Sequence, residues 1–277
     1  METWLIENDY NIPQGAADAF NGYIKQGMKF FVAKVNLEAF EESGQVFLRP
    51  LLMAFESDDF MLPIQLGTVN ANGPQDLVIF MLSPKGRVET SNYRMANIPS
   101  DVNIPEFIED DFGNFYLDMF AHGYEREDRD AVFLEYAWDM AWCDPCAADP
   151  LSEEELRRAG VFWLDDSANF GAPNVYLTRM HLRYTSETHP EDLMFEVTDN
   201  RENFQGRYIL QRPFEGAITC EAGKNYIVQV KERQEKEAQT LANLTGWDIT
   251  DIRAEITPYR PEEDVPSWWE RTFDRFR

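Results

Sequence analysis

Strand-length apolar runs follow one another closely in the first 95 residues, and most of the turns between them are short. The runs are 28–37, 47–57, 60–69, 76–82 and 87–95. Between the third and fourth runs stands Asn72-Gly73-Pro74, a strong turn signal. Antiparallel neighbours need only such a turn, whereas parallel neighbours need a crossover of about a dozen residues or more. The pattern therefore predicts an antiparallel meander in which 60–82 forms a hairpin.

Helical spacing replaces this pattern later in the chain. Ile108, Phe112 and Phe115 recur at i, i+4 and i+7, and a capping box begins at Ser152. We expect helices over 13–26, 105–121, 152–160, 226–244 and 248–256, and further strands over 131–140, 174–185, 193–198 and 207–212. The expected fold is α+β, with an antiparallel β-sheet core, peripheral helices and a C-terminal helical segment.

The sequence contains no internal repeat of fixed period. We expect 1–256 to form a single α+β domain, within which two lobes would divide near 100–130. Three prolines, Pro258, Pro261 and Pro266, frame an acidic stretch after it. Prolines at that spacing favour an extended path, so 257–277 is expected to be a linker followed by an aromatic docking tail.

The charge balance excludes several classes of partner. The chain has 25 Lys and Arg against 50 Asp and Glu, a net charge of −25. Such a chain would be repelled by nucleic acid and by an anionic membrane surface. No apolar run approaches the ~20 residues of a membrane span, and no signal peptide is recognisable at the start. We therefore expect neither a nucleic-acid partner nor a membrane span.

Local catalytic motifs are missing from the sequence. It contains no phosphate-binding glycine loop, no Gly-x-Ser-x-Gly and no His-Glu-x-x-His, and His122, His181 and His189 are scattered. A catalytic set assembled across the fold stays open, but the pattern favours a protein without catalysis and predicts no cofactor.

Cys143 and Cys146 form a Cys-x-x-Cys pair. A redox pair needs its first cysteine at a helix N-terminus, and here the next helix starts only at Ser152. A zinc site would need Cys220 and one histidine in addition. The favoured interpretation is structural, with the two cysteines forming a short disulfide or holding a loop as thiols.

Arg179, His181 and Arg183 alternate on one face of the expected strand 174–185. Such a cationic stripe in an acidic chain could bind an anion or an acidic partner. The alternative is that Asp or Glu side chains on neighbouring strands pair with it.

The acidic runs 109–111 and 262–264 are most simply solvated surface. Weak binding of surface calcium by them stays open, and no dedicated metal site is predicted.

The end of the chain carries four aromatic residues, Trp268, Trp269, Phe273 and Phe276, with arginines between them. Aromatic residues and Arg are the typical anchors of protein interfaces. We expect this tail to dock on a protein partner or on a second copy of the chain.

Several stretches resemble a known family in both content and order. They are Phe31-Val-Ala-Lys34-Val, Phe60-Met-Leu-Pro-Ile-Gln-Leu-Gly67, Val69-Asn-Ala-Asn-Gly-Pro-Gln75, Glu135-Tyr-Ala-Trp138, Cys143-Asp-Pro-Cys146, Asn203-Phe-Gln-Gly206-Arg-Tyr208 and Ala238-Gln-Thr-Leu-Ala-Asn-Leu-Thr-Gly246-Trp-Asp248. Over most of 1–256 the chain resembles the C-terminal half of the bacterial domain-of-unknown-function family 2330. The resemblance implies an extracytoplasmic protein of the periplasm or cell surface and implies no particular reaction.

These observations favour a non-catalytic interaction or structural protein of the bacterial cell envelope, such as an accessory subunit of a larger assembly. The alternative is a thiol-redox or metal-dependent factor built around Cys143 and Cys146.

Overall fold

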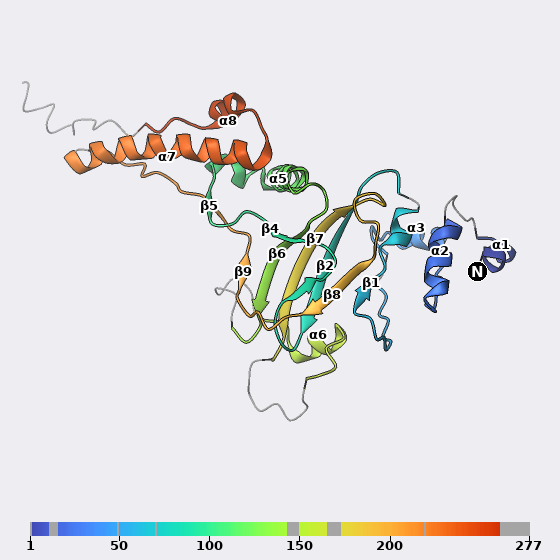
Figure 1. Ribbon diagram of the computed structural model, residues 1–277. Coiled ribbons are helices and arrows are strands. Elements are labelled where there is room, and N and C mark those ends of the chain that lie inside the picture. Colours follow the sequence, from blue (N-terminus) through green and yellow to red (C-terminus); the bar gives the residue numbers. More distant parts are fainter. Residues whose placement is uncertain are drawn as a thin grey trace, which may run out of the picture. The chain divides into compact units, whose positions relative to one another are not determined.

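The computed structural model describes residues 2–10, 16–48, 50–69, 71–142, 150–164, 173–218 and 220–260. The chain divides into two compact units, and it passes between them more than once (Figure 1). Among the described residues, the first unit comprises 2–95 and 130–203, and the second comprises 96–129 and 204–260. The described chain combines helices with mainly antiparallel sheets, which confirms the predicted α+β fold class.

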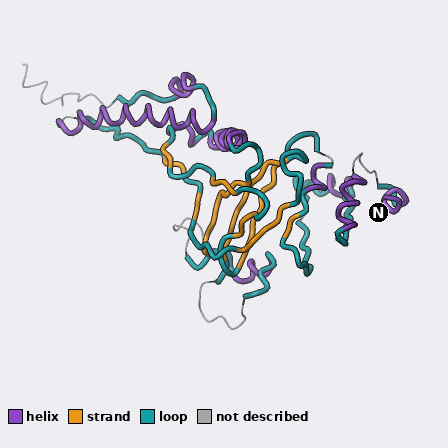
Figure 2. Tube along the Cα trace, viewed as in Figure 1, coloured by secondary structure: helices purple, strands orange, loops and turns teal. Residues whose placement is uncertain are grey.

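The central strand of the first unit is β7 (Tyr176–Tyr184). It pairs antiparallel with β2 (Gln75–Ser83) on one side and with β6 (Val132–Asp139) on the other, and these strands lie side by side in Figure 2. This sheet confirms the strands predicted over 131–140 and 174–185.

Alternation along β7 separates the two faces of this sheet. Met180 and Leu182 on one face are fully buried. They belong to a core of Ile64, Ile79, Val88, Val132, Met180, Leu182, Tyr184, Leu193 and Phe195. Burying one such side chain contributes about 1.5–3 kcal/mol. The opposite face of β7 carries the charged stripe predicted from the sequence.

A shorter antiparallel sheet also belongs to the first unit. β8 (Leu193–Val197) lies between β1 (Met61–Leu62) and β3 (Val88–Thr90). Because Leu193 and Phe195 of β8 belong to the same core as Met180, one set of apolar side chains packs with both sheets.

The helices of the first unit are short. They are α1 (Glu2–Glu7), α2 (Ala16–Lys25), α3 (Leu37–Glu42), α4 (Gln65–Thr68) and α6 (Glu153–Arg158). α2 confirms the predicted helix 13–26 over its described residues. α6 starts at the predicted capping box, in which Ser152 and Glu155 bond to each other's backbone N–H groups.

The second unit is built around α7 (Glu221–Thr245), the longest described helix. α7 packs on α5 (Phe112–Arg126) and on α8 (Ile249–Glu255). Their shared core is formed by Ile104, Ile108, Phe115, Met119, Ala238, Leu241 and Ile252. Gly246 ends α7 with a φ of 75°, a left-handed conformation that favours glycine, and Asp248 caps α8.

Short elements complete the second unit. The 3₁₀ helix η1 (Glu106–Glu109) precedes α5, and β5 (Val102–Asn103) pairs parallel with β10 (Tyr208–Ile209). β4 (Met95–Asn97) and β9 (Phe204–Gln205) lie where the chain passes from one unit to the other. The helix predicted over 105–121 is thus divided into η1 and α5, because a turn at Asp110 and Asp111 separates them.

The hairpin predicted over 60–82 is wrong. Met61 and Leu62 pair with β8, and β2 pairs with β7, so the two runs have different partners. Gln65–Thr68 between them is helical. Pro63 lacks the N–H that a continued strand would donate, which favours an early end to β1.

The described residues of the runs 28–37 and 47–57, which the sequence also predicted as strands, form no strand. An apolar run indicates that a segment can join a sheet, but a strand also needs a partner with unpaired backbone groups. No such partner faces these two runs in the described residues.

None of the helices in the described ranges combines the length and the apolar character needed to cross a bilayer.

His189 is fully buried in the first unit. Its ring lies against Tyr93 at 4.6 Å and Tyr184 at 6.4 Å between centroids, and its Nδ1 is 3.1 Å from the Thr188 hydroxyl. Its Nε2 has no hydrogen-bond partner among the described residues. Burial lowers the pKa of His189 and outweighs the opposing effect of the Asp130 carboxylate.

We expect the free energy of unfolding to fall as the pH drops below about 6.5, the usual pKa of histidine. In that range the unfolded chain takes up a proton that the folded chain resists, so the slope approaches about 1.4 kcal/mol per pH unit. Urea unfolding across this range should show the slope in the wild type and in the control His122→Gln, but not in His189→Gln. A His189→Gln profile parallel to that of the wild type would contradict this assignment.

Candidate functional site

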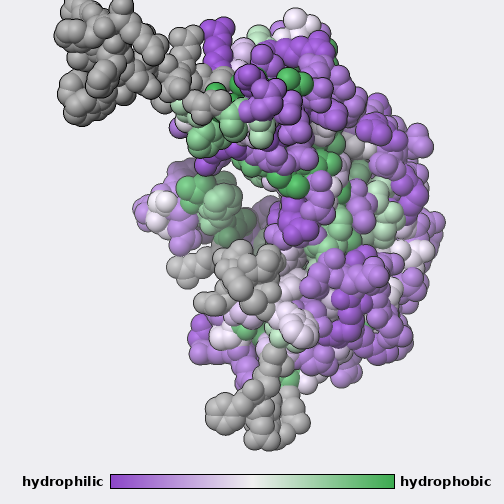
Figure 3. Space-filling view, turned by 90° about the vertical axis from the view of Figure 1, so that its left-hand side faces the viewer, coloured by the Kyte–Doolittle hydropathy of each residue, from purple (hydrophilic) through white to green (hydrophobic). Residues whose placement is uncertain are grey.

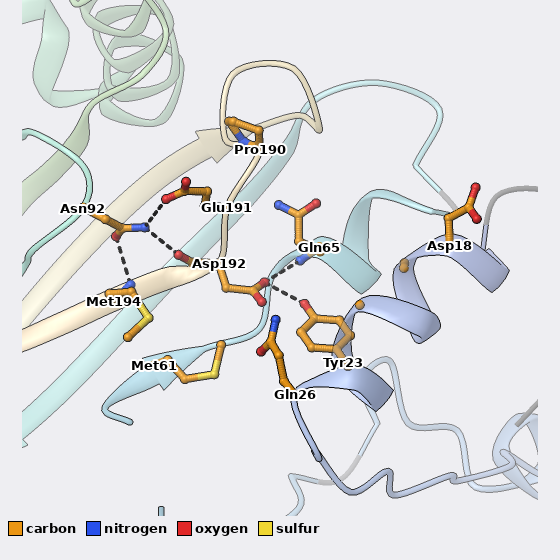
Figure 4. A pocket seen from close by; sticks show the side chains of 12 residues that line it. Asp18, Tyr23, Gln26, Met61, Gln65, Asn92, Pro190, Glu191, Asp192 and Met194 are labelled. Atoms are coloured by element: carbon orange, nitrogen blue, oxygen red, sulfur yellow. Dashed lines mark hydrogen bonds between the residues drawn. The ribbon is translucent and has the colours of Figure 1, made fainter. Parts of the chain in front are cut away.

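An open cavity of about 420 Å³ lies in the first unit between α2, the start of α4 and the loop that leads into β8 (Figure 4). Most of the residues that line it have polar side chains, although much of the exposed wall is apolar. The polar groups are the carboxylates of Asp18, Glu191 and Asp192, the amides of Gln26, Gln65 and Asn92, and the Tyr23 hydroxyl. The residues that line the cavity thus include three carboxylates and no Lys or Arg.

Asp192 organises the cavity. Its Oδ1 accepts hydrogen bonds from the Tyr23 hydroxyl at 2.6 Å, the Ile64 N–H at 2.8 Å and the Gln65 N–H at 3.1 Å. Two of these donors stand where α4 begins, a helix end whose N–H groups need acceptors. One carboxylate therefore joins α2, α4 and the β8 loop.

The Tyr23 side chain is held in its protonated form. Burial raises the pKa of its hydroxyl well above the usual value, and the hydrogen bond to the Asp192 carboxylate raises it further. A hydroxyl that keeps its proton remains a donor to Asp192. This pair thus acts as a structural tie across the cavity rather than as a nucleophile with its base.

Asn92 completes the frame from the opposite side of the β8 loop. Its Nδ2 donates to the Asp192 carbonyl at 2.8 Å, and its Oδ1 accepts from the Met194 N–H at 3.0 Å. Figure 4 shows these bonds beside the Asp192 carboxylate and its hydrogen bonds to the Tyr23 hydroxyl and the Gln65 backbone. The sequence reasoning missed Asp192 and Tyr23, which lie 169 residues apart and carry no local motif.

The predicted stripe on β7 is paired with carboxylates from both neighbouring strands. Arg179 Nε lies 2.8 Å from Glu135 Oε2, an ion pair without hydrogen-bond alignment, and His181 Nδ1 lies 2.9 Å from Glu135 Oε1. Glu135 is almost fully buried. The register of β6 against β7 shifts between Leu134 and Tyr136, so Glu135 stands at an irregularity in the ladder.

Arg183 at the end of the stripe makes a bidentate pair with Asp76 of β2, at 2.8 and 2.9 Å. The guanidinium lowers the pKa of Asp76 below its usual value. This is the cross-strand pairing that the sequence left open as an alternative. Binding of an anion or an acidic partner by Arg179, His181 and Arg183 stays a prediction.

Other predicted site residues lie outside the described part of the chain. These are Cys143 and Cys146 and the tail aromatics Trp268, Trp269, Phe273 and Phe276. Cys220 is described, and it is exposed and forms no disulfide. No group of three or more His, Cys, Asp or Glu among the described residues is arranged to hold a metal ion.

A second unpredicted feature is the exposure of an apolar segment, 46–55. Its described large side chains are all exposed, and they are Val46, Phe47, Leu48, Leu51, Leu52, Met53 and Phe55. The sequence marked this segment as a strand but carried no sign that it would lack a partner.

The Tyr23–Asp192 bond can be tested directly. Tyr23→Phe removes one hydrogen bond to a charged group, worth about 1.5–3 kcal/mol. Hydrogen exchange should become faster at the amides of α2 while the Ile64 amide stays protected by Asp192. Asp18→Asn, in the same wall but without a bond to Tyr23, is the matched control. Equal exchange in the two variants would show that the bond does not hold α2.

The family described as Uncharacterized protein conserved in bacteria (DUF2330) matches residues 1–196. This range contains Tyr23, Asp192 and segment 46–55. No curated protein and no solved structure matches the chain. The match covers well over half of the 277 residues and confirms the resemblance to this family up to residue 196, while the stretches noted at 203–208 and 238–248 lie beyond it. The chain therefore belongs to the bacterial family DUF2330.

Proposed function

We propose that this chain is a non-catalytic interaction protein of the bacterial cell envelope, an accessory subunit that donates segment 46–55 to a sheet of a partner protein. The observation that carries the proposal is the exposure of that segment. Phe47 is 83% exposed and Phe55 is 82% exposed. Contiguous apolar surface of this kind on a folded protein typically marks an interaction site.

The backbone of the segment is as available as its side chains. Residues 46–48 and 50–55 belong to no helix or strand and form no backbone hydrogen bond within the described chain. Pro50 has no N–H to donate, but the other unpaired N–H and C=O groups of this apolar sequence are a template for addition to another sheet.

The side-chain pattern indicates what the partner must supply. In an extended conformation Phe47, Leu51 and Phe55 share one face, while Leu48 and Leu52 share the other. A strand that is apolar on both faces is stable only when both are covered, as in the interior of a layered fold. The partner is therefore a β-rich protein whose open sheet edge adjoins an apolar core.

The surface outside segment 46–55 favours binding to a specific partner over non-specific binding to many proteins. The face in Figure 3 is mostly hydrophilic, and apolar residues appear on it in separate small groups. With a net charge of −25 the molecules repel one another, so association depends on specific contacts. Assignment to the envelope rests on the family resemblance noted in the sequence.

A photo-reactive amino acid at position 47, in the bacterium that encodes the chain, tests the contact. We expect one discrete crosslinked product in the envelope fraction, and none when the same group replaces exposed Glu42 of α3. Phe55→Asp should abolish the product, because it places a charge in an interface that excludes water.

Recovery of the protein in the cytoplasm would contradict the envelope assignment. Equal crosslinking from positions 47 and 42, or none from 47, would contradict the role of segment 46–55. Circular dichroism of Phe55→Asp should match that of the wild type, since the side chain contributes little to the folded core.

A further inference from the structure

A second cavity, of about 350 Å³, lies within the second unit between β5 and one face of α7. Its polar wall consists of Asp101 and Asn103 from the β5 segment and of Arg233, Lys236, Glu237 and Thr240 from α7. The α7 residues share one side of the helix because they are spaced three to four positions apart.

Glu237 is the unusual member of this wall. Its side chain is only 5% exposed, although it carries a carboxylate. Arg233 Nε lies 3.2 Å from Glu237 Oε1, but neither atom has a hydrogen-bond partner within the described residues. Burial raises the pKa of Glu237, so its ionised form lacks adequate solvation there. Buried polar atoms in native proteins nearly always have a hydrogen-bond partner. The lack of one at Arg233 Nε and Glu237 Oε1 therefore needs an explanation.

The neighbouring polar groups are held in place from outside the cavity. Gln211 accepts from Arg233 Nη1 at 3.0 Å and donates to Asn103 Oδ1 at 2.7 Å. Asp101 is paired with Arg207 at 2.8 Å. These bonds fix the wall but leave Arg233 Nε and Glu237 Oε1 without a hydrogen bond in the described chain.

The charge of the wall is balanced. Asp101 and Glu237 are acidic, and Arg233 and Lys236 are basic, in a chain with twice as many acids as bases. A bare cation or a bare anion would satisfy one half of such a wall and be repelled by the other. A small molecule with both charges satisfies both halves.

We propose that this cavity binds a small zwitterion of the α-amino acid type. Its ammonium group donates to Glu237, and its carboxylate accepts from Arg233 Nε and Lys236. A single carbon separates the two groups in such a ligand, which suits two side chains whose polar atoms are 3.2 Å apart. The volume leaves room for a side chain, since small-ligand pockets start at roughly 300 Å³. This site is independent of the partner contact proposed for segment 46–55.

Calorimetric titration of the full chain with four small probes tests the site. Alanine carries both charges, propionate lacks the ammonium, ethylamine lacks the carboxylate, and glycerol is uncharged. We expect saturable binding of alanine and binding at least about tenfold weaker for the other three, because each loses charge-assisted hydrogen bonds.

Two variants locate the site. Glu237→Gln keeps the shape of the side chain and should weaken alanine binding about tenfold or more. Lys236→Gln, at an exposed position that does not support the fold, should also weaken it. Glu232→Gln, an exposed carboxyl on the same helix, is the matched control and should bind as the wild type does.

Absence of alanine binding by the wild type overturns the proposal. Equal binding of alanine by wild type, Glu237→Gln and Lys236→Gln overturns it as well. Binding of propionate, ethylamine or glycerol as tight as that of alanine excludes the zwitterion. None of these results bears on crosslinking from position 47, so the two proposals fail separately.

Discussion

The strand β7 is the element on which the first unit depends, because it pairs along its whole length with β2 and along most of it with β6. One face of β7 must be shielded from water, and the charges of Arg179 and Arg183 on the other face must be paired. Met180 and Leu182 meet the first requirement through a shared core. Glu135 and Asp76 meet the second from the two neighbouring strands. Loss of one carboxylate would leave a partly buried cation without its partner, which is costly in a sheet interior.

Glu135 of β6 contacts two residues of the stripe. Its carboxylate lies 2.8 Å from Arg179 Nε and 2.9 Å from His181 Nδ1. The register of β6 against β7 shifts between Leu134 and Tyr136, so Glu135 stands at an irregularity in the ladder. An acidic chain has an excess of carboxylates, so its basic residues are readily paired, and this explains why the stripe is not simply an exposed cationic surface.

Local features of the fold were predictable from the sequence, and long-range pairing was not. The capping box at Ser152 and the alternation of β7 are each set by neighbouring residues, and the structure confirms them. The hairpin over 60–82 failed because β1 takes its partner from residues 193 and 194, far along the chain. Asp192 escaped notice for the same reason, since its donors come from α2 and from the start of α4. Stripe residues were recognisable as a pattern, but the sequence did not show which of the 50 acids would meet them.

The extent of the family match separates the features of the chain into two groups. The match ends inside β8, at residue 196. It therefore includes the core around β7, the Asp192 junction and the exposed segment 46–55. It also includes β5, but not α7, which supplies Arg233, Lys236 and Glu237 to the second cavity. The interaction proposed for 46–55 thus depends on the part of the chain that the family match covers, whereas the ligand proposed for the second cavity would be bound largely by residues of a helix outside it. The two proposals also rest on different parts of the fold, because α7 packs in the core of the second unit, and that core shares no residue with the core around β7.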